Sequence, residues 1–204
     1  MISSGLRKRW VLVWVLAALS ASAQQPDAQT KRLVESGQVL VGGHNVPYLI
    51  RRLPVDSFPD LPEGVADQLN QRQCMIPQSY EAHHPENVVR GSLERPGSSD
   101  WAVLCSAGGK VSLLIIFGSS PAKPVALATV PETDRLQRHD SSGVLGFNWA
   151  IDPASPETVR QAQSVMEHKP PRLDHDALED TIIDRKTVYR FFSKGVWTLV
   201  DMPQ

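Results

Sequence analysis

Cysteine is nearly absent from this 204-residue sequence, which contains only Cys74 and Cys105. Neither has a second Cys or a His at the spacing of a zinc-binding motif, so the pattern does not favour a zinc site. In an exported protein an even pair predicts a disulfide. This one would close a loop of about 30 residues and stabilise the fold by roughly 3–4 kcal/mol. A reactive or metal-binding thiol is the alternative.

Long hydrophobic runs are also missing. The apolar run near the N-terminus, residues 10–19, is shorter than the roughly 20 residues that span a bilayer. Basic residues 7–9 precede it and small residues 21–23 follow it, which is typical of a secretory signal peptide over residues 1–23. An uncleaved N-terminal anchor is the alternative. We expect an exported protein, periplasmic or secreted, with no stable membrane insertion after cleavage at Ala23.

An excess of positive charge is missing as well. The chain has 21 Lys and Arg against 22 Asp and Glu. Residues 1–23 contain three of the basic residues and no acidic one, so the cleaved chain keeps 18 basic against 22 acidic residues, a formal charge of −4. Phosphate backbones are bound by basic stripes. We therefore expect no nucleic-acid partner.

The common signatures of catalysis and cofactor binding are lacking. The sequence has no Gly-x-Ser-x-Gly, no Ser-x-x-Lys and no His-Glu-x-x-His. The Gly-Gly-His-Asn segment at 42–45 matches neither a phosphate loop nor a dinucleotide fingerprint, and it predicts a turn. His83 and His84 are adjacent, so in an extended segment they point to opposite faces and are expected to be solvated loop residues. No cofactor is predicted.

Two apolar runs, residues 101–105 and 111–117, are the most hydrophobic part of the chain after the leader. Both are rich in β-branched and large apolar side chains, and the segment between them contains Gly108 and Gly109. This pattern predicts a β-hairpin at the centre of a sheet.

Further strands and helices are predicted around this hairpin. The expected strands are residues 46–53, 87–93, 124–130, 143–151, 186–192 and 196–201. The expected helices are residues 31–37, 62–72 and a segment that begins after Ser155. Residues 54–62, with their three prolines, should cross irregularly and be pinned to the core by Phe58 and Leu61, and residues 131–142 should form a loop.

We predict an α+β fold from this pattern: a single domain dominated by an antiparallel β-sheet of about eight strands, with two or three short helices. The β-rich globular domain should cover residues 45–204, after a flexible N-terminal segment at residues 24–44. Of the tryptophans beyond the leader, Trp101 and Trp197 are expected in the core, whereas Trp149 could be partly exposed.

Residues 88–104, from Val88-Val89-Arg90-Gly91 to Asp100-Trp101-Ala102-Val103, resemble a single hairpin of the FG-GAP or VCBS type. The resemblance implies a calcium-binding turn. This turn offers only two carboxylates, Glu94 and Asp100, with Pro96 between them, so Asp100 is expected to cap backbone N–H groups instead. The chain is also similar to small exported bacterial proteins of unknown function, through residues 74–78 and the hairpin at 189–199, which implies no established activity.

The densest acidic cluster lies at residues 174–184. If residues 176–183 formed a helix, Asp176 and Asp180 would share a face with Asp184 one turn further on, and these oxygens could hold Ca²⁺ or Mg²⁺ with His175 as a base. This would make a metal-assisted hydrolase. The other interpretation is a solvated charged face with Leu178 and Ile182 turned inward.

The sequence thus favours an exported non-enzymatic binding or accessory domain of the bacterial envelope. Its partner, a protein or a small molecule, is not identified by any motif. The hydrolase built on the acidic cluster is the alternative.

Overall fold

The computed structural model describes residues 33–164 and 172–201, in which strands dominate. The predicted signal peptide, residues 1–23, lies outside the described residues. The strands are β1 Val34–Val41, β2 His44–Pro54, β3 Met75–Gln78, β4 Val88–Gly91, β5 Asp100–Ala107, β6 Lys110–Ile116, β7 Val125–Pro131, β8 Leu136–Arg138, β9 Leu145–Phe147, β10 Trp149–Ala154, β11 Ala177–Ile182, β12 Lys186–Ser193 and β13 Val196–Asp201. The helices of the described ranges are α2 Glu63–Gln71 and α3 Pro156–Ala162, with 3₁₀ turns η1 Val55–Ser57 and η2 Glu132–Arg135.

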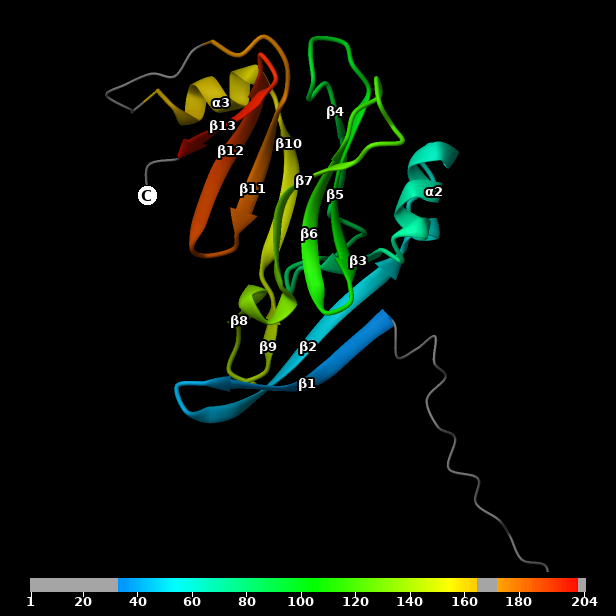
Figure 1. Cartoon of the computed structure of the whole chain (residues 1–204). Helices are drawn as coiled ribbons and strands as arrows, with labels where there is room; N and C mark the ends of the chain where they lie inside the picture. The colour runs from blue at the N-terminus through cyan, green and yellow to red at the C-terminus, as the bar shows by residue number, and fades with distance from the viewer. Residues whose placement is uncertain (1–32, 165–171, 202–204) are drawn as a thin grey trace, which may run out of the picture.

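The strands form two sheets (Figure 1). The first has nine strands in the order β7-β6-β5-β3-β2-β9-β8, with β1 on the other edge of β2 and β4 beside β5. All its neighbours are antiparallel except β2 and β9, which run parallel. The second sheet has the order β10-β11-β12-β13 and is antiparallel throughout.

Three apolar cores separate four layers. The first core lies between the two sheets and includes Ile50, Leu104, Phe147 and Trp149. The second lies between the nine-stranded sheet and α2, and the third between the four-stranded sheet and α3. Strand β5 contributes to the first two because its side chains alternate, which explains why its residues are buried from Asp100 to Ser106.

The predicted central hairpin is confirmed. Strands β5 and β6 pair from Trp101–Ile116 to Ala107–Lys110, and Gly108 and Gly109 close the turn with positive φ angles of 58° and 74°. Such angles are typical of the two-residue turns that match strand twist. The strands predicted at 186–192 and 196–201 also pair as a hairpin, and because Ser193 pairs directly with Val196 its turn has two residues.

The predicted disulfide is confirmed by a bond between Cys74 and Cys105, whose Cα atoms are 5.0 Å apart. Helix α2 explains the approach of the two sulfurs: Val65 and Leu69 bury one face of it against the sheet, and the chain then returns along Cys74 to β3. Phe58 and Leu61 pack in the same core, as predicted.

The N-terminal predictions are corrected by strand β1. Residues 34–37 are a strand and not part of a helix over 31–37, because β1 pairs with β2 along its whole length, from Val34–Arg51 to Val41–His44. The described part of segment 24–44 is therefore a regular hairpin strand rather than a flexible segment. The pairing with β2 overrides the local preference of this short stretch.

Three further predictions are corrected. Residues 131–142, expected to be a loop, contain η2 and β8. The single strand expected at 143–151 is two strands, β9 and β10, that belong to different sheets. Trp149 is fully buried because this change of sheet places it between the layers.

The prediction of one β-dominated, mainly antiparallel domain is confirmed in that coarse form. The α+β class is not confirmed, because the described ranges contain only two short α-helices, each packed on the outside of a sheet.

Candidate functional site

The acidic cluster does not form the helix that a metal site would need. Residues 177–182 are strand β11, paired on both edges, so the assumed helix over 176–183 is wrong. Leu178 points into the core between the sheets and Ile182 packs against it, as the alternative interpretation predicted.

The three aspartates of the cluster are bound by different parts of the fold. Asp176 accepts a hydrogen bond from the backbone N–H of Ser92 at 2.9 Å. Asp184 accepts one from the hydroxyl group of Tyr80 at 2.8 Å. Asp176 precedes β11 and Asp184 follows it, so these two carboxylates stand at opposite ends of the strand and do not converge.

Asp180 is buried between the layers. Its carboxylate accepts hydrogen bonds from Trp149 Nε1 at 2.5 Å and Arg190 Nε at 2.7 Å. The guanidinium of Arg135 lies 4.6 Å from the centre of the Trp149 ring, and burial lowers the pKa of Arg135. Asp180 therefore links β10 and β12, the two neighbours of β11 in the four-stranded sheet, through charge-assisted hydrogen bonds, and both of its oxygens are occupied.

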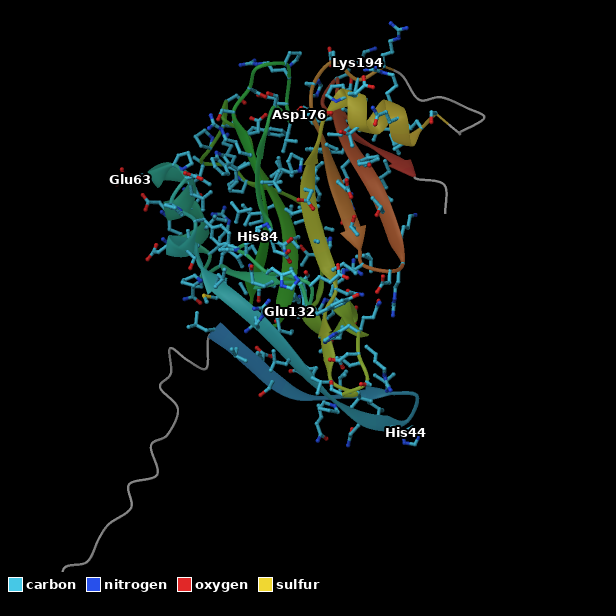
Figure 2. All side chains as sticks on the ribbon, turned by 180° about the vertical axis from the view of Figure 1, so that it is seen from behind. His44, Glu63, His84, Glu132, Asp176 and Lys194 are labelled. Carbon is cyan, nitrogen blue, oxygen red and sulfur yellow. A yellow bond between two sulfur atoms is a disulfide. The ribbon has the colours of Figure 1, made fainter. Side chains whose placement is uncertain are left out.

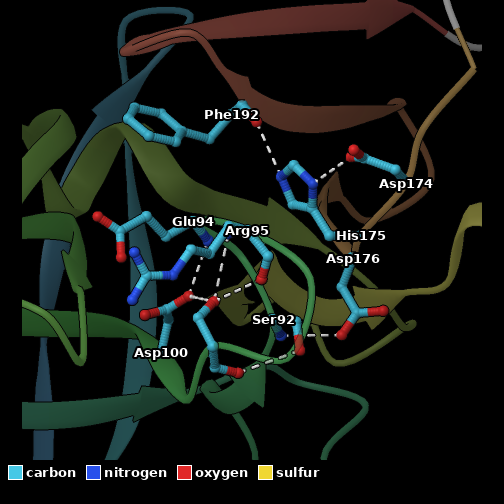
Figure 3. Close-up of polar contacts among 9 residues, drawn as sticks. Ser92, Glu94, Arg95, Asp100, Asp174, His175, Asp176 and Phe192 are labelled. Carbon is cyan, nitrogen blue, oxygen red and sulfur yellow. Dashed lines mark hydrogen bonds and ion pairs between the residues drawn. The ribbon is translucent and has the colours of Figure 1, made fainter.

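His175 is held within the fold by three contacts (Figure 3). Its Nδ1 lies 2.6 Å from Asp174 Oδ1, its Nε2 lies 2.8 Å from the carbonyl oxygen of Phe192, and its ring centre is 4.5 Å from that of Phe191. Only 7% of the residue is exposed. His175 thus fastens the segment before β11 to β12, and both of its ring nitrogens have partners other than Asp180 and Asp184.

Asp100 caps the turn before β5, as predicted, and Figure 3 shows its carboxylate at the centre of that turn. Oδ2 accepts from the backbone N–H of Glu94 at 2.7 Å and from the hydroxyl group of Ser98, and Oδ1 accepts from the N–H of Gly118 at 2.8 Å. The residue is completely buried. Both oxygens accept from protein groups, so the aspartate holds this turn together by hydrogen bonds to its N–H and O–H donors.

Within residues 33–164 and 172–201, no group of three or more His, Cys, Asp and Glu side chains is arranged to hold a metal ion. His83 and His84 are exposed loop residues, as predicted, and Figure 2 shows His84 on the surface behind the sheets. The residues proposed for a hydrolase therefore do not meet.

A groove on the α2 side of the nine-stranded sheet is the best candidate for a functional site. It has a volume of about 490 Å³. It is lined by Ser57, Phe58, Pro59, Asp60, Leu61, Pro85, Val88, Arg90 and Trp101. The loop after η1 forms one wall, and β4 and β5 form the floor, with Trp101 paired directly opposite Arg90.

The groove combines apolar surface with two charges. Trp101 belongs to the second core and is only 5% exposed, so it presents a fixed aromatic surface. Arg90 is exposed and donates through Nε to Ser99 Oγ at 3.2 Å, but it forms no ion pair within the described ranges. Asp60 is exposed and has no hydrogen-bond or ion-pair partner there either. Both charges are therefore available to a ligand.

A second hollow, of about 280 Å³, lies where β2, β9 and the loop between β8 and β9 meet. Tyr80 and His139 stack in it with ring centres 4.5 Å apart and planes 9° from parallel. Burial, and next the hydrogen bond to Asp184, raise the pKa of Tyr80. The stack lies directly on Gly146, where an added Cβ would be 2.6 Å from Tyr80 Cβ. Tyr80 and His139 already contact each other, and Tyr80 also donates to Asp184, so this hollow is less suited to a ligand than the groove.

Sequence reasoning missed the groove. Phe58 and Trp101 were recognised as core residues, but nothing in their spacing places Arg90 beside them. Alternation along β4 gave the only signal, since Val88 and Arg90 share a face of the strand.

Comparison with known proteins assigns the chain to no family: no family model, no curated protein and no solved structure matches it. Among the helices of the described residues, none has both the length and the apolar character to cross a membrane.

Proposed function

We propose that this protein is an exported binding domain of the bacterial envelope that acts without catalysis, through the groove between the η1 loop and β4. The observation that supports the proposal is the pairing of a fixed aromatic floor at Trp101 with an exposed guanidinium, at Arg90, that has no ion-pair partner in the described part of the chain.

The chemistry of the groove indicates the ligand class. Ligand sites in proteins are mostly apolar with a few polar groups that fix orientation. Phe58, Leu61 and Trp101 supply the apolar surface, and Arg90 can bind a carboxylate through two parallel hydrogen bonds. We propose an extended peptide that carries an apolar side chain next to an acidic one.

Export is part of the same proposal. The Cys74–Cys105 disulfide is consistent with an oxidising compartment, where such bonds persist. The leader pattern of residues 1–23 points to the same route.

The alternative hydrolase has less support. His175, Asp176, Asp180 and Asp184 would have to leave their hydrogen bonds with four separate partners before they could surround a metal ion. Each of these bonds stabilises the fold, so such a rearrangement would cost stability that no other contact of the four residues offsets.

A peptide-display experiment tests the proposed function. A random hexapeptide library selected on the purified protein should enrich peptides that pair an acidic with an apolar residue. The variant Arg90→Glu should lose that enrichment, whereas Arg95→Glu should keep it. Arg95 is the matched control because it is exposed, lies on the nearby turn and does not line the groove.

Titration of one enriched peptide then gives the size of the effect. Arg90→Glu should weaken binding at least 10-fold, since it replaces an attraction with a repulsion. Equal binding to both charge-reversal variants, or no enrichment on the wild type, would refute the proposal.

A further inference from the structure

Strand β1 is an edge strand without the usual protection. It pairs with β2 along one side only, and no described strand covers the other side. Edge strands of natural sheets are normally short, bulged, or interrupted by Pro or Lys. Strand β1 is eight residues long, has continuous register with β2 and contains neither Pro nor Lys.

The other free edges are better protected. Strand β7 ends in Pro131 and pairs with β6 through a register shift at Leu113/Leu114. Strand β10 contains Pro153, and β8 has only three residues. Strand β13 also has a free edge, with Val196 and Leu199 exposed, so it serves as the control below.

The surface of β1 is apolar at both ends. Val34 is 39% exposed, Leu40 is 69% exposed and Val41 is 49% exposed. The one charged residue of the strand, Glu35, is bound within its own sheet, 2.7 Å from Arg52 Nη2 and 3.2 Å from the hydroxyl oxygen of Tyr48. The free edge therefore carries no charge that would repel a second strand.

The order of residues along β1 is self-complementary. In an antiparallel pair of two β1 strands centred on Gly37, Val34 of one copy lies opposite Leu40 of the other, and Ser36 lies opposite Gln38. On the outward face, apolar residues then face apolar ones and polar residues face polar ones, and this face continues from one strand to the other. On the inward face Glu35 lies opposite Val39, but its charge is already paired with Arg52 of its own sheet. Gly37 suits the centre of this pair because it has no side chain. The ring of Tyr48 already occupies that space, 2.9 Å from where a Cβ would be.

The position of the hairpin allows this pairing. Figures 1 and 2 show the β1–β2 hairpin projecting beyond the body of the two sheets, with His44 at its tip. Antiparallel pairing places Val34 of each β1 strand toward the partner's hairpin tip, so the starts of the two β1 strands lie at opposite ends of the pair. We infer that the β1 edge binds a second copy of this chain, joining two nine-stranded sheets into one. This inference is independent of the groove.

The oligomeric state tests the inference. Sedimentation equilibrium of the purified, disulfide-bonded protein should show a monomer–dimer equilibrium. Leu40→Lys should shift the dissociation constant at least 10-fold toward monomer. Leu199→Lys, on the edge strand β13 where Leu199 is 54% exposed, should leave it unchanged.

A crosslinking experiment tests the register. An equimolar mixture of Val34→Cys and Leu40→Cys proteins should form a covalent dimer on mild oxidation, because residue 34 of one copy lies opposite residue 40 of the other. Each variant alone should not, because the two introduced cysteines of its dimer would lie at opposite ends of the paired strands. A monomer at all concentrations, a dimer disrupted by Leu199→Lys instead of Leu40→Lys, or no excess crosslinking in the mixture would overturn the inference.

Discussion

The side-chain oxygen of Asn87 accepts a hydrogen bond from the backbone N–H of Ile151 at 3.0 Å, across the boundary between the two sheets. The amide nitrogen of the same side chain donates to the carbonyl oxygens of Trp149 at 3.3 Å and Pro77 at 2.7 Å. One amide thus replaces the backbone pairing that β4 and β10 do not make. It adds a polar link to the apolar core that already joins the two sheets.

Replacement of Asn87 should destabilise the protein strongly. Asn87→Ala would leave buried backbone groups of β3 and β10 without partners, and each such group costs about 1–3 kcal/mol. Asn87 also has a φ angle of 69°, which a non-Gly residue rarely adopts and which Asn tolerates better than Ala. We expect a loss of about 3 kcal/mol in the free energy of unfolding, measured in urea.

Asn87→Gly separates the two causes, because glycine accepts the φ angle but makes no side-chain bond. If it were as stable as the wild type, the hydrogen bonds to Ile151 and Trp149 would not matter.

Removing one partner of the buried ion pair between Arg52 and Glu132 should lower the stability of the protein. Arg52 donates to Glu132 through Nε at 3.2 Å and through Nη2, and Ser106 also donates to Glu132. Glu132 is 2% exposed. Glu132→Gln should cost about 1.5–3 kcal/mol, because Arg52 and Ser106 lose the charged acceptor while Glu35, 2.7 Å from Arg52, still pairs with the guanidinium. The double variant Arg52→Met with Glu132→Leu should recover most of that loss.

The exposed pair Glu157–Arg160 provides the control, with side chains 55% and 67% exposed. Glu157→Gln should cost less than about 1 kcal/mol in thermal or urea unfolding. Similar costs at both pairs would mean that burial is not the cause.

Gly146 should not tolerate a side chain. A Cβ at this position would lie 2.6 Å from Tyr80 Cβ and 2.9 Å from His139 Cδ2, so the stacked pair would have to move. Gly146→Ala should destabilise the fold by about 1–3 kcal/mol. By contrast, Gly64 in α2 has open space around it, and Gly64→Ala should stabilise by about 0.5–1 kcal/mol. Calorimetric unfolding of both variants measures these changes in stability. A Gly146→Ala protein as stable as the wild type would contradict the packing around Gly146.

Asp152 should make stability depend on pH. Partial burial of its carboxyl group, and then the charge of Glu86, raise the pKa of Asp152. A raised pKa means that the folded state holds the proton more tightly, so ionisation at neutral pH costs stability, and the cost disappears as the pH falls through the raised pKa.

Asp152→Asn should therefore be more stable than the wild type at pH 7, by up to about 0.5 kcal/mol because the residue is exposed and solvent screens the charges. The difference should vanish in acid. Unfolding curves from pH 3 to pH 7 measure it, and a gain that is independent of pH would exclude this explanation.

The sequence by itself determined the local features. Alternating apolar residues and Gly-Gly turns predict the β5–β6 hairpin, a serine followed by proline predicts the start of α3, where Ser155 accepts from the N–H of Thr158, and two cysteines predict the disulfide. These features depend on neighbours in the chain, which periodicity and turn chemistry report directly.

Only the tertiary structure decided the rest. Residues 145–154 are divided between two sheets, and β1 is a strand because β2 lies beside it. The groove joins residues 58, 90 and 101, and Arg52 finds Glu132 80 positions away. Such contacts are set by how layers stack, and a pattern that repeats over a few residues contains no information about which distant strand will lie across from it.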